Sequence, residues 1–300
     1  MLTRNDLINN PELAREKALG ALAGLAIGDS FGDAGRVPEN HQNYGMILSF
    51  DSGKVWSTDD TEFAIFTAKM LIDHNGDPSH KDLAEGWLKY IAAQDDFPRG
   101  GNSEIDAAEN LKRGIMPPES GRRAVYGFSD GACMRISPVG IICAGDVEHA
   151  KELAKRDAEV SHFRSGIWAA QAVAAAVATA MVSGTDEEII EAAMSCIPTD
   201  SWLYDNMKHM LELVELAEKH GVTLRCSAAV GGGIPWLANL ERTLEQETIT
   251  RISGIMNGTT NYILTEMKTK GKSYADALSE AQAKGYAEKD PTADVEGIDT

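Results

Sequence analysis

Apolar residues recur with helical spacing through roughly the first 215 residues of the chain. A repeat near 3.6 residues places these side chains on one face of a helix, where they pack against other helices. No run in this part alternates apolar and polar residues for long enough to predict a strand. The pattern predicts a mainly α fold, a helical bundle with glycine-rich loops near its helix ends. We expect helices over residues 12–33, 59–74, 80–94, 103–114, 146–162, 167–182 and 185–197, the first breaking at Gly28 and Gly32.

The pattern changes near residue 213, inside the stretch HMLELVELAEKHG. No Pro-, Gly- or Ser-rich linker marks this point, which counts against a clean domain boundary. The order of elements beyond it predicts a small α/β segment, a sheet with helices on one or both faces. We expect strands over 221–235 and 248–258 and helices over 236–246, 259–271 and 273–285. The sequence thus divides into a first part, 1–212, and a second part, 213–300.

The predicted sheet has two strands, so each has an edge that another chain can extend. We expect these strands to pair with each other or with a partner chain. Unpaired edges and exposed apolar surface favour association. The sequence therefore predicts a homo-oligomer formed through the C-terminal sheet.

Charge excludes two kinds of partner. The chain has 46 acidic and 28 basic residues, a net charge of −18. Such a surface repels DNA, RNA and anionic membranes. A small phosphate-bearing ligand stays compatible, because a metal ion or a helix N-terminus supplies local positive potential.

Several features predict a cytoplasmic protein with no membrane partner. The four cysteines form no CxxC pair, so neither a disulfide framework nor a zinc site is expected. The N-terminus is polar and charged, unlike a signal peptide. The longest apolar stretch, residues 167–182, is shorter than the ~20 residues that span a bilayer.

Two adjacent carboxylates, Asp59 and Asp60, open the helix predicted from residue 59. One interpretation is structural: Ser57 or Thr58 caps the helix, and the acidic first turn favours its positive end. The other is chemical, because clustered carboxylate oxygens suit Mg²⁺, Mn²⁺ or Ca²⁺. This stretch alone leaves both interpretations open.

Four motifs in the first part, taken together, extend the chemical interpretation. They are GALAGLAIGDSFG at 20–32, WSTDDTEFA at 56–64, SDGACMRISPVG at 129–140 and VSHFRSG at 160–166. In this order they resemble the ADP-ribosylglycohydrolase family, over about residues 14–212. The resemblance implies an all-α hydrolase that acts on ADP-ribosylated protein or an ADP-ribose-type small molecule with two divalent ions, Mg²⁺ or Mn²⁺. It also implies that Thr58, Asp59 and Asp60 are metal ligands.

The same resemblance implies further site residues. The SDGACMR loop is similar to the ribose-diphosphate loop of the family, so Ser129, Gly131 and Met134 are expected to bind ligand, as is His162. The alternatives are a tight turn that packs Met134 into the core, and a capping or core histidine. We expect Asp59 and Asp60 to face one cleft with Asp29, Gly131 and His162.

An acidic residue acts near the scissile bond in this family. Asp33 and Glu39 compete for that role here, because DAGRVPEN departs from the usual spacing, and Asp60 completes the expected catalytic set. The family also has a second Asp-Thr-Asp-Thr-type metal motif, and none follows residue 212. We therefore expect a weak metal site and impaired turnover.

The second part resembles another family. Its segments AAVGGGIP, ISGIMNGTTNYIL and AQAKGYAEKDPTADVEGID are similar to the catalytic region of homoserine dehydrogenase, over about residues 213–300. The resemblance places Gly258 and Thr259 in a substrate loop. It implies that Glu288 and Asp294 bind the substrate ammonium group and that Asp299 lies beside the reacting carbon. No GxGxxG follows a predicted strand, so we expect no Rossmann domain and no bound NAD(P).

Three functional hypotheses follow. The first is an ADP-ribosylglycohydrolase-like hydrolase that cleaves ADP-ribosyl N- or O-glycosidic bonds, with impaired turnover. The second is a fragment of a homoserine dehydrogenase-type, NAD(P)-dependent oxidoreductase of amino-acid biosynthesis. The third is an inactive fusion chain that keeps part of an ADP-ribose cleft. The number of motifs favours the first.

Overall fold

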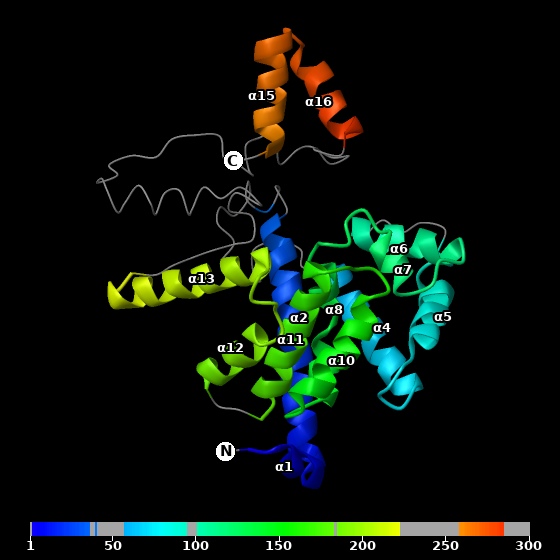
Figure 1. Ribbon diagram of the computed structural model, residues 1–300, viewed down its shortest axis with the longest axis vertical. Coiled ribbons are helices and arrows are strands. Elements are labelled where there is room, and N and C mark those ends of the chain that lie inside the picture. The colour runs from blue at the N-terminus through cyan, green and yellow to red at the C-terminus, as the bar shows by residue number, and fades with distance from the viewer. Residues whose placement is uncertain are drawn as a thin grey trace. The chain divides into compact units, whose positions relative to one another are not determined.

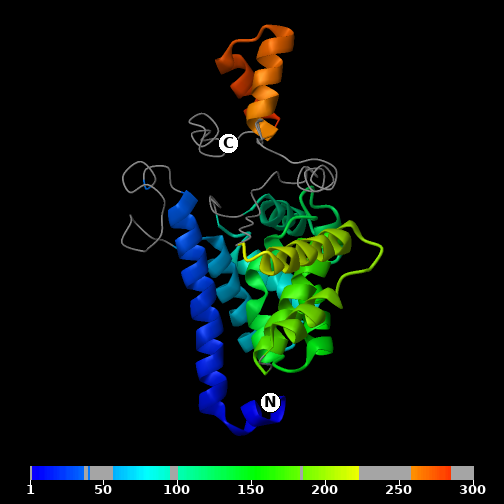
Figure 2. The same ribbon diagram turned by 90° about the vertical axis from the view of Figure 1, so that its left-hand side faces the viewer.

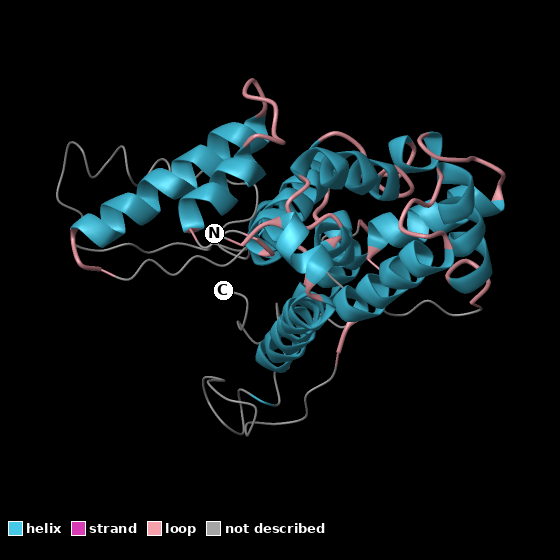
Figure 3. Ribbon diagram, turned by 90° about the horizontal axis from the view of Figure 1, so that it is seen from below, coloured by secondary structure: helices cyan, strands magenta, loops and turns pink. Residues whose placement is uncertain are grey.

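A computed structural model describes residues 2–36, 40, 57–94, 101–182, 185–222 and 258–284. The chain forms two compact units. Unit 1 comprises Met1–Asn40 and Tyr44–Leu213, and unit 2 comprises His41–Asn43 and Val214–Thr300. The described residues form helices joined by turns and loops, with no strand among them (Figure 3). None of the described helices is long and apolar enough to cross a membrane.

Unit 1 is a helical bundle, as its apolar periodicity predicted (Figure 1). Each helix predicted in this part is present, with its ends shifted by a few residues. Its helices are α1 (Arg4–Asn9), α2 (Pro11–Arg36), α4 (Asp59–Asp73), α5 (His80–Tyr90), α6 (Asn102–Lys112), α7 (Glu119–Arg122), α8 (Gly131–Arg135), α9 (Ser137–Ile142), α10 (Val147–Ala158), α11 (Ser165–Ala180), α12 (Asp186–Met194) and most of α13 (Trp202–Lys219).

The predicted break at Gly28 and Gly32 is wrong. Helix α2 continues through both residues for 26 residues and is the long blue helix of Figure 2. A glycine inside a helix costs up to about 1 kcal/mol relative to alanine but blocks no backbone hydrogen bond. Contacts of α2 with α4 and α9 offset this cost, so packing decides against the local preference.

The alanine-rich helix α11 contacts α8, α9, α10 and α12 and forms the centre of the bundle. Its small side chains allow neighbouring helices to approach closely. The closest approach is at Gly140 of α9, where a Cβ atom would lie 2.5 Å from Val177 Cβ. One core cluster surrounds α11 and includes Leu71 of α4, Ile136, Val139 and Leu153.

A second core cluster holds the other side of α4 against α5 and α6. It includes Phe63, Met70, Trp87 and Leu111. The rings of Phe63 and Trp87 lie 5.5 Å apart. Helix α4 therefore packs into both clusters, which fixes the position of its N-terminus.

Helix α13 carries the chain from unit 1 into unit 2. The division between the units falls between Leu213 and Val214, inside this continuous helix. The sequence pattern changes at the same place and likewise shows no linker. The two predicted strands and the helix predicted at 236–246 lie almost wholly outside the described residues, which end at 222 and resume at 258.

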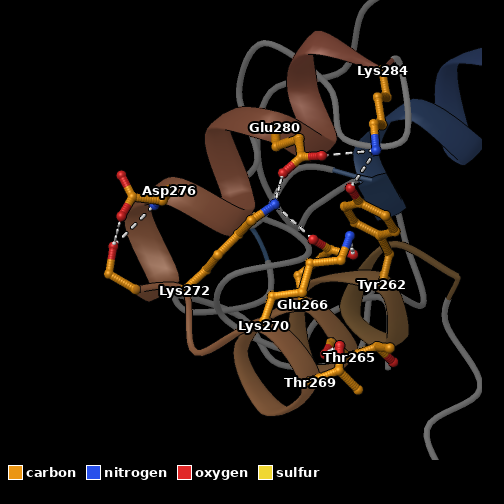
Figure 4. Close-up of polar contacts among 10 residues, drawn as sticks. Tyr262, Thr265, Glu266, Thr269, Lys270, Lys272, Asp276, Glu280 and Lys284 are labelled. Atoms are coloured by element: carbon orange, nitrogen blue, oxygen red, sulfur yellow. Dashed lines mark hydrogen bonds and ion pairs between the residues drawn. The ribbon is translucent and has the colours of Figure 1, made fainter.

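The described part of unit 2 contains a helical hairpin, α15 (Gly258–Lys270) and α16 (Tyr274–Ala283). Both helices were predicted from sequence, at 259–271 and 273–285. Ile263, Ala277 and Ala281 form the small core between them. Lysine and glutamate side chains join the two helices across the hairpin, as Figure 4 shows.

Candidate functional site

The N-terminus of α4 is tied to α2 by one aspartate. Asp29 of α2 accepts hydrogen bonds from the Thr58 backbone N–H at 2.8 Å and from its hydroxyl at 2.5 Å. The backbone N–H and hydroxyl of Thr61 also donate to it, at 3.3 and 2.5 Å. Burial acts to raise the pKa of Asp29, but these hydrogen bonds outweigh it and hold the pKa below its ordinary value. Asp29 is therefore an ionised anchor for the start of α4.

Thr58 caps α4, as the structural interpretation predicted. Its side-chain oxygen accepts from the Asp60 backbone N–H at 3.4 Å. The same oxygen lies 3.0 Å from Asp60 Oδ2. The Thr58 hydroxyl therefore lies within donating distance of two carboxylates, those of Asp29 and Asp60.

The side chains at the start of α4 also offer oxygen atoms as ligands for a hard cation. Thr58 Oγ1 and Asp60 Oδ2 are oxygen donors of the kind that Mg²⁺ prefers, and their 3.0 Å separation is that of a hydrogen bond between them. Asp59 adds a further carboxylate, and burial, Asp60 and Glu104 raise its pKa. A bound cation would offset the cost of burying the Asp59 carboxylate and its repulsion by Asp60 and Glu104. The donors fit Mg²⁺ or Mn²⁺ in kind.

The donors are few in number. Among the described residues, no group of three or more His, Cys, Asp and Glu side chains is placed to hold a metal ion. A hard cation prefers about six oxygen ligands. The described part of the site therefore supplies an incomplete ligand set, which water would have to complete.

A cleft of about 530 Å³ lies beside this carboxylate group. Asp33 and Met134, two residues selected from the sequence, line it with Thr58 and Asp60. Its α2 wall includes Gly28, Asp29 and Gly32, and a Cβ on either glycine would meet no atom within 4 Å. The glycines that were predicted to break the helix instead leave this wall of the cleft open.

Ser129 and Gly131 are not among the residues that line the cleft, and Gly131 lies next to a buried carboxylate. A Cβ on Gly131 would lie 2.6 Å from Glu104 Oε1 and 3.0 Å from Ser103 Oγ. Glycine is therefore required here because Glu104 approaches the backbone of α8 closely. The sequence interpretation had instead expected Gly131 to bind ligand as part of a ribose-diphosphate loop.

His162 lies in the interior and is fully buried. Its Nε2 lies 3.1 Å from Ser129 Oγ, and its Nδ1 lies 2.8 Å from Ser161 Oγ. Burial, with the charge of Arg135, lowers the pKa of His162 from 6.5 to about 3. The structure thus joins His162 to the 129–131 loop but places its ring in the core, as the alternative interpretation stated, and not on the cleft wall.

Sequence analysis missed the charged residues beneath this loop. Arg135, Glu104 and Asp157 are all buried, and Arg135 Nε donates to Asp157 Oδ1 at 2.7 Å. One signal was available: Glu104 shares a helix face with Ala107, Ala108 and Leu111. A charged residue at such a position indicates a buried partner.

The remaining predicted site residues are only partly covered by the structure. Glu39 lies outside the described residues, so its competition with Asp33 stays open. Gly258 and Thr259 begin helix α15, and the description of this end of the helix covers its backbone alone. Glu288, Asp294 and Asp299 lie outside the described residues.

Comparison with known proteins gives two kinds of match. A family model described as ADP-ribosylglycohydrolase matches residues 10–284, which reaches past the predicted limit of residue 212. Homoserine dehydrogenases of Neisseria gonorrhoeae and Mycobacterium tuberculosis are 53% identical over 88 residues, 29% of this chain and 20% of each relative. That of Methanocaldococcus jannaschii is 52% identical over 89 residues, 30% of this chain and 26% of the relative. The chain thus spans about a fifth to a quarter of these relatives.

Proposed function

This chain belongs to the ADP-ribosylglycohydrolase family, and on that basis we propose that it hydrolyses ADP-ribosyl N- or O-glycosidic bonds. The single observation that carries the proposal is the cleft, where Asp33, Thr58 and Asp60 lie around one space beside the start of α4. Carboxylates at a fixed helix start supply the groups that water attack on a glycosidic carbon requires. The substrate would be an ADP-ribosylated protein or a small molecule of ADP-ribose type.

Thr58, Asp59 and Asp60 would hold Mg²⁺ or Mn²⁺, which polarises ribose hydroxyls and acidifies a bound water. The chain's own residues hold this arrangement in place. Asp29 fixes the hydroxyls of Thr58 and Thr61, so both threonine rotamers are set before ligand binds. Asp33 lies on the α2 wall, where it would accept a proton or hydrogen-bond a ribose hydroxyl.

The small number of metal ligands among the described residues supports the expectation of impaired turnover. A hard cation with few carboxylate ligands keeps several waters and binds weakly. A loosely held ion also positions the ribose less well, and misplaced groups reduce rates by orders of magnitude. We expect millimolar affinity for Mg²⁺ and hydrolysis several orders of magnitude slower than typical enzymatic turnover.

A binding experiment tests the site without requiring turnover. ADP-ribose is titrated calorimetrically into the chain with and without Mg²⁺, using Asp60→Asn and the matched control Asp73→Asn. Asp73 ends the same helix as an exposed carboxylate paired with Lys69. We expect Mg²⁺-dependent binding that Asp60→Asn removes and Asp73→Asn keeps. Equal binding by both variants would reject the proposed site.

The second candidate function, for unit 2, is that of a fragment of a homoserine dehydrogenase-type oxidoreductase. Over 88 residues this part of the chain is 53% identical to a homoserine dehydrogenase. Hydride transfer also needs a bound nicotinamide and a proton donor, and the sequence has no Rossmann fingerprint. We expect no oxidation of homoserine with NAD or NADP, and light scattering tests the proposed association through this segment.

A further inference from the structure

A closed circuit of polar contacts runs through the interior of unit 1. The circuit joins a buried arginine to the 129–131 loop and returns to the arginine through a glutamate. Its six members, in order, are Arg135, Ser161, His162, Ser129, Ser103 and Glu104. The contacts between successive members measure 2.9, 2.8, 3.1, 3.2, 2.7 and 3.4 Å.

The charged groups at the two ends of this series of contacts, Arg135 and Glu104, determine which group donates at each step. A guanidinium only donates hydrogen bonds, and an ionised carboxylate only accepts them. Arg135 Nη2 donates to Ser161 Oγ, and among the described residues His162 Nδ1 is the acceptor within reach of the Ser161 hydroxyl proton. The neutral ring must then carry its hydrogen on Nε2.

From His162 to Glu104 the hydrogen bonds run in the same direction. Nε2–H of His162 donates to Ser129 Oγ, and Ser129 donates to Ser103 Oγ. Ser103 then donates to Glu104 Oε2. In the opposite tautomer Ser129 would donate to His162, and no proton would lie between Ser129 and Ser103. Only the Nε2–H tautomer satisfies every contact in the circuit.

The charged groups around the ring exclude the imidazolium. Arg135 faces His162 through Ser161, while Asp157 and Glu104 are engaged with Arg135. A second ring proton, on Nδ1, would point at a Ser161 oxygen that already accepts from Arg135. The Ser161 proton would then be left without a partner in the interior, which is unfavourable.

We propose that His162 is a positioning residue, held as the neutral Nε2–H tautomer, that turns the Ser129 proton toward Ser103. Ser129 then keeps one free lone pair and no free proton. A ligand hydroxyl that reaches Ser129, such as that of a ribose, would find an acceptor there, whereas a phosphate would find no donor. This last step rests on the proposed function and on the sequence-based expectation that the 129–131 loop binds ligand; the tautomer does not.

The tautomer is measured on the unmodified chain by ¹⁵N–¹H correlation spectra after ¹⁵N-histidine labelling. The chain has seven histidines, and the spectrum of His162→Gln assigns the His162 signals by their loss. We expect a protonated Nε2, an unprotonated Nδ1 and no titration from pH 8 to 5. A protonated Nδ1, or a ring that titrates in this range, would overturn the proposal.

A second arm tests what Ser129 offers a ligand. Binding of ADP-ribose and of inorganic pyrophosphate is compared between the wild-type chain and Ser129→Ala. Loss of one neutral hydrogen bond should weaken ADP-ribose about 2- to 12-fold and leave pyrophosphate unchanged. Equal weakening of both would show that Ser129 donates to phosphate, against the proposal. If the wild-type chain binds neither, the proposed function fails and the tautomer spectra still decide the role of His162.

Discussion

Each unit contains a network of ion pairs, and the two networks differ in their contact with water. In unit 1, Arg135 pairs with Asp157 and Glu104, and all three side chains are at most 3% exposed. In the unit 2 hairpin, Lys272 pairs with Glu266 and Glu280 (Figure 4). The Lys272 and Glu280 side chains are 28% and 30% exposed.

The difference shows that a contact distance does not measure the contribution of an ion pair. Removing one partner of a buried pair leaves the other charge without water, at a cost of about 3–5 kcal/mol. A solvated pair loses little, because water and salt replace the partner. The unit 1 network should therefore determine the stability and geometry of the site, while the hairpin network adjusts local structure.

The largest expected effect is at Arg135. Arg135→Met would leave Asp157 and Glu104 buried and unpaired, and remove the guanidinium that lies 5.1 Å from the Trp87 ring. We expect a loss of about 3–5 kcal/mol in the free energy of unfolding, measured by urea denaturation. The matched control is Arg156→Met, because Arg156 pairs with Asp77 near the surface, and it should cost less than about 1 kcal/mol. Equal losses would remove the contrast between buried and exposed pairs.

The next largest effect is a pH dependence of stability that differs between the two units. The pKa of His162 falls from 6.5 to about 3 on folding, so the unfolded chain takes up a proton that the folded chain does not. The stability from neutral His162 is complete above pH 6.5 and falls below it, by about 1.4 kcal/mol per pH unit, until pH approaches about 3. His162→Gln should abolish this slope in denaturation at pH 6 and pH 5.

In the hairpin the corresponding acid transition occurs at lower pH. Hydrogen bonds from Lys272, Lys284 and Tyr262 lower the pKa of Glu280 from 4.5 to about 2. Its contribution is therefore present above pH 4.5 and is lost as pH falls toward 2. A unit 1 slope that also began only below pH 4.5 would contradict the assigned state of His162.

The smallest effect is expected at Lys272. Lys272→Met removes ion pairs to Glu280, which is 30% exposed, and to Glu266, which is 8% exposed but keeps Lys270 as a partner. We expect less than about 1 kcal/mol, smaller still in high salt because ions screen such pairs. Circular dichroism of the variant at low and high salt checks this. A loss as large as that of Arg135→Met would mean that the hairpin network is the dominant one.

Sequence reasoning predicted most of the longer helices of both units because apolar periodicity is local, and it missed the short helices α1, α7, α8 and α9. It also identified Thr58–Asp60 at a helix start, and Asp33 and Met134 as site residues that share the cleft. It failed at Gly28, where packing of α2 overrides the preference of glycine. Local patterns could not identify the partners of Arg135, since Asp157 and Glu104 lie 22 and 31 residues away in the chain. Only the folded bundle brings these charges together.

The most direct test of the proposed function is release of ADP-ribose. The purified chain is incubated with Mg²⁺ or Mn²⁺ and an ADP-ribosylated protein, beside Asp59→Ala and the control Asp73→Ala. We predict metal-dependent release slower than about 10⁻² s⁻¹, against a typical enzymatic rate of about 10 s⁻¹, lost in Asp59→Ala and kept in Asp73→Ala. Release at an ordinary enzymatic rate, or release that Asp59→Ala leaves unchanged, would contradict an incomplete metal site centred on Asp59 and Asp60.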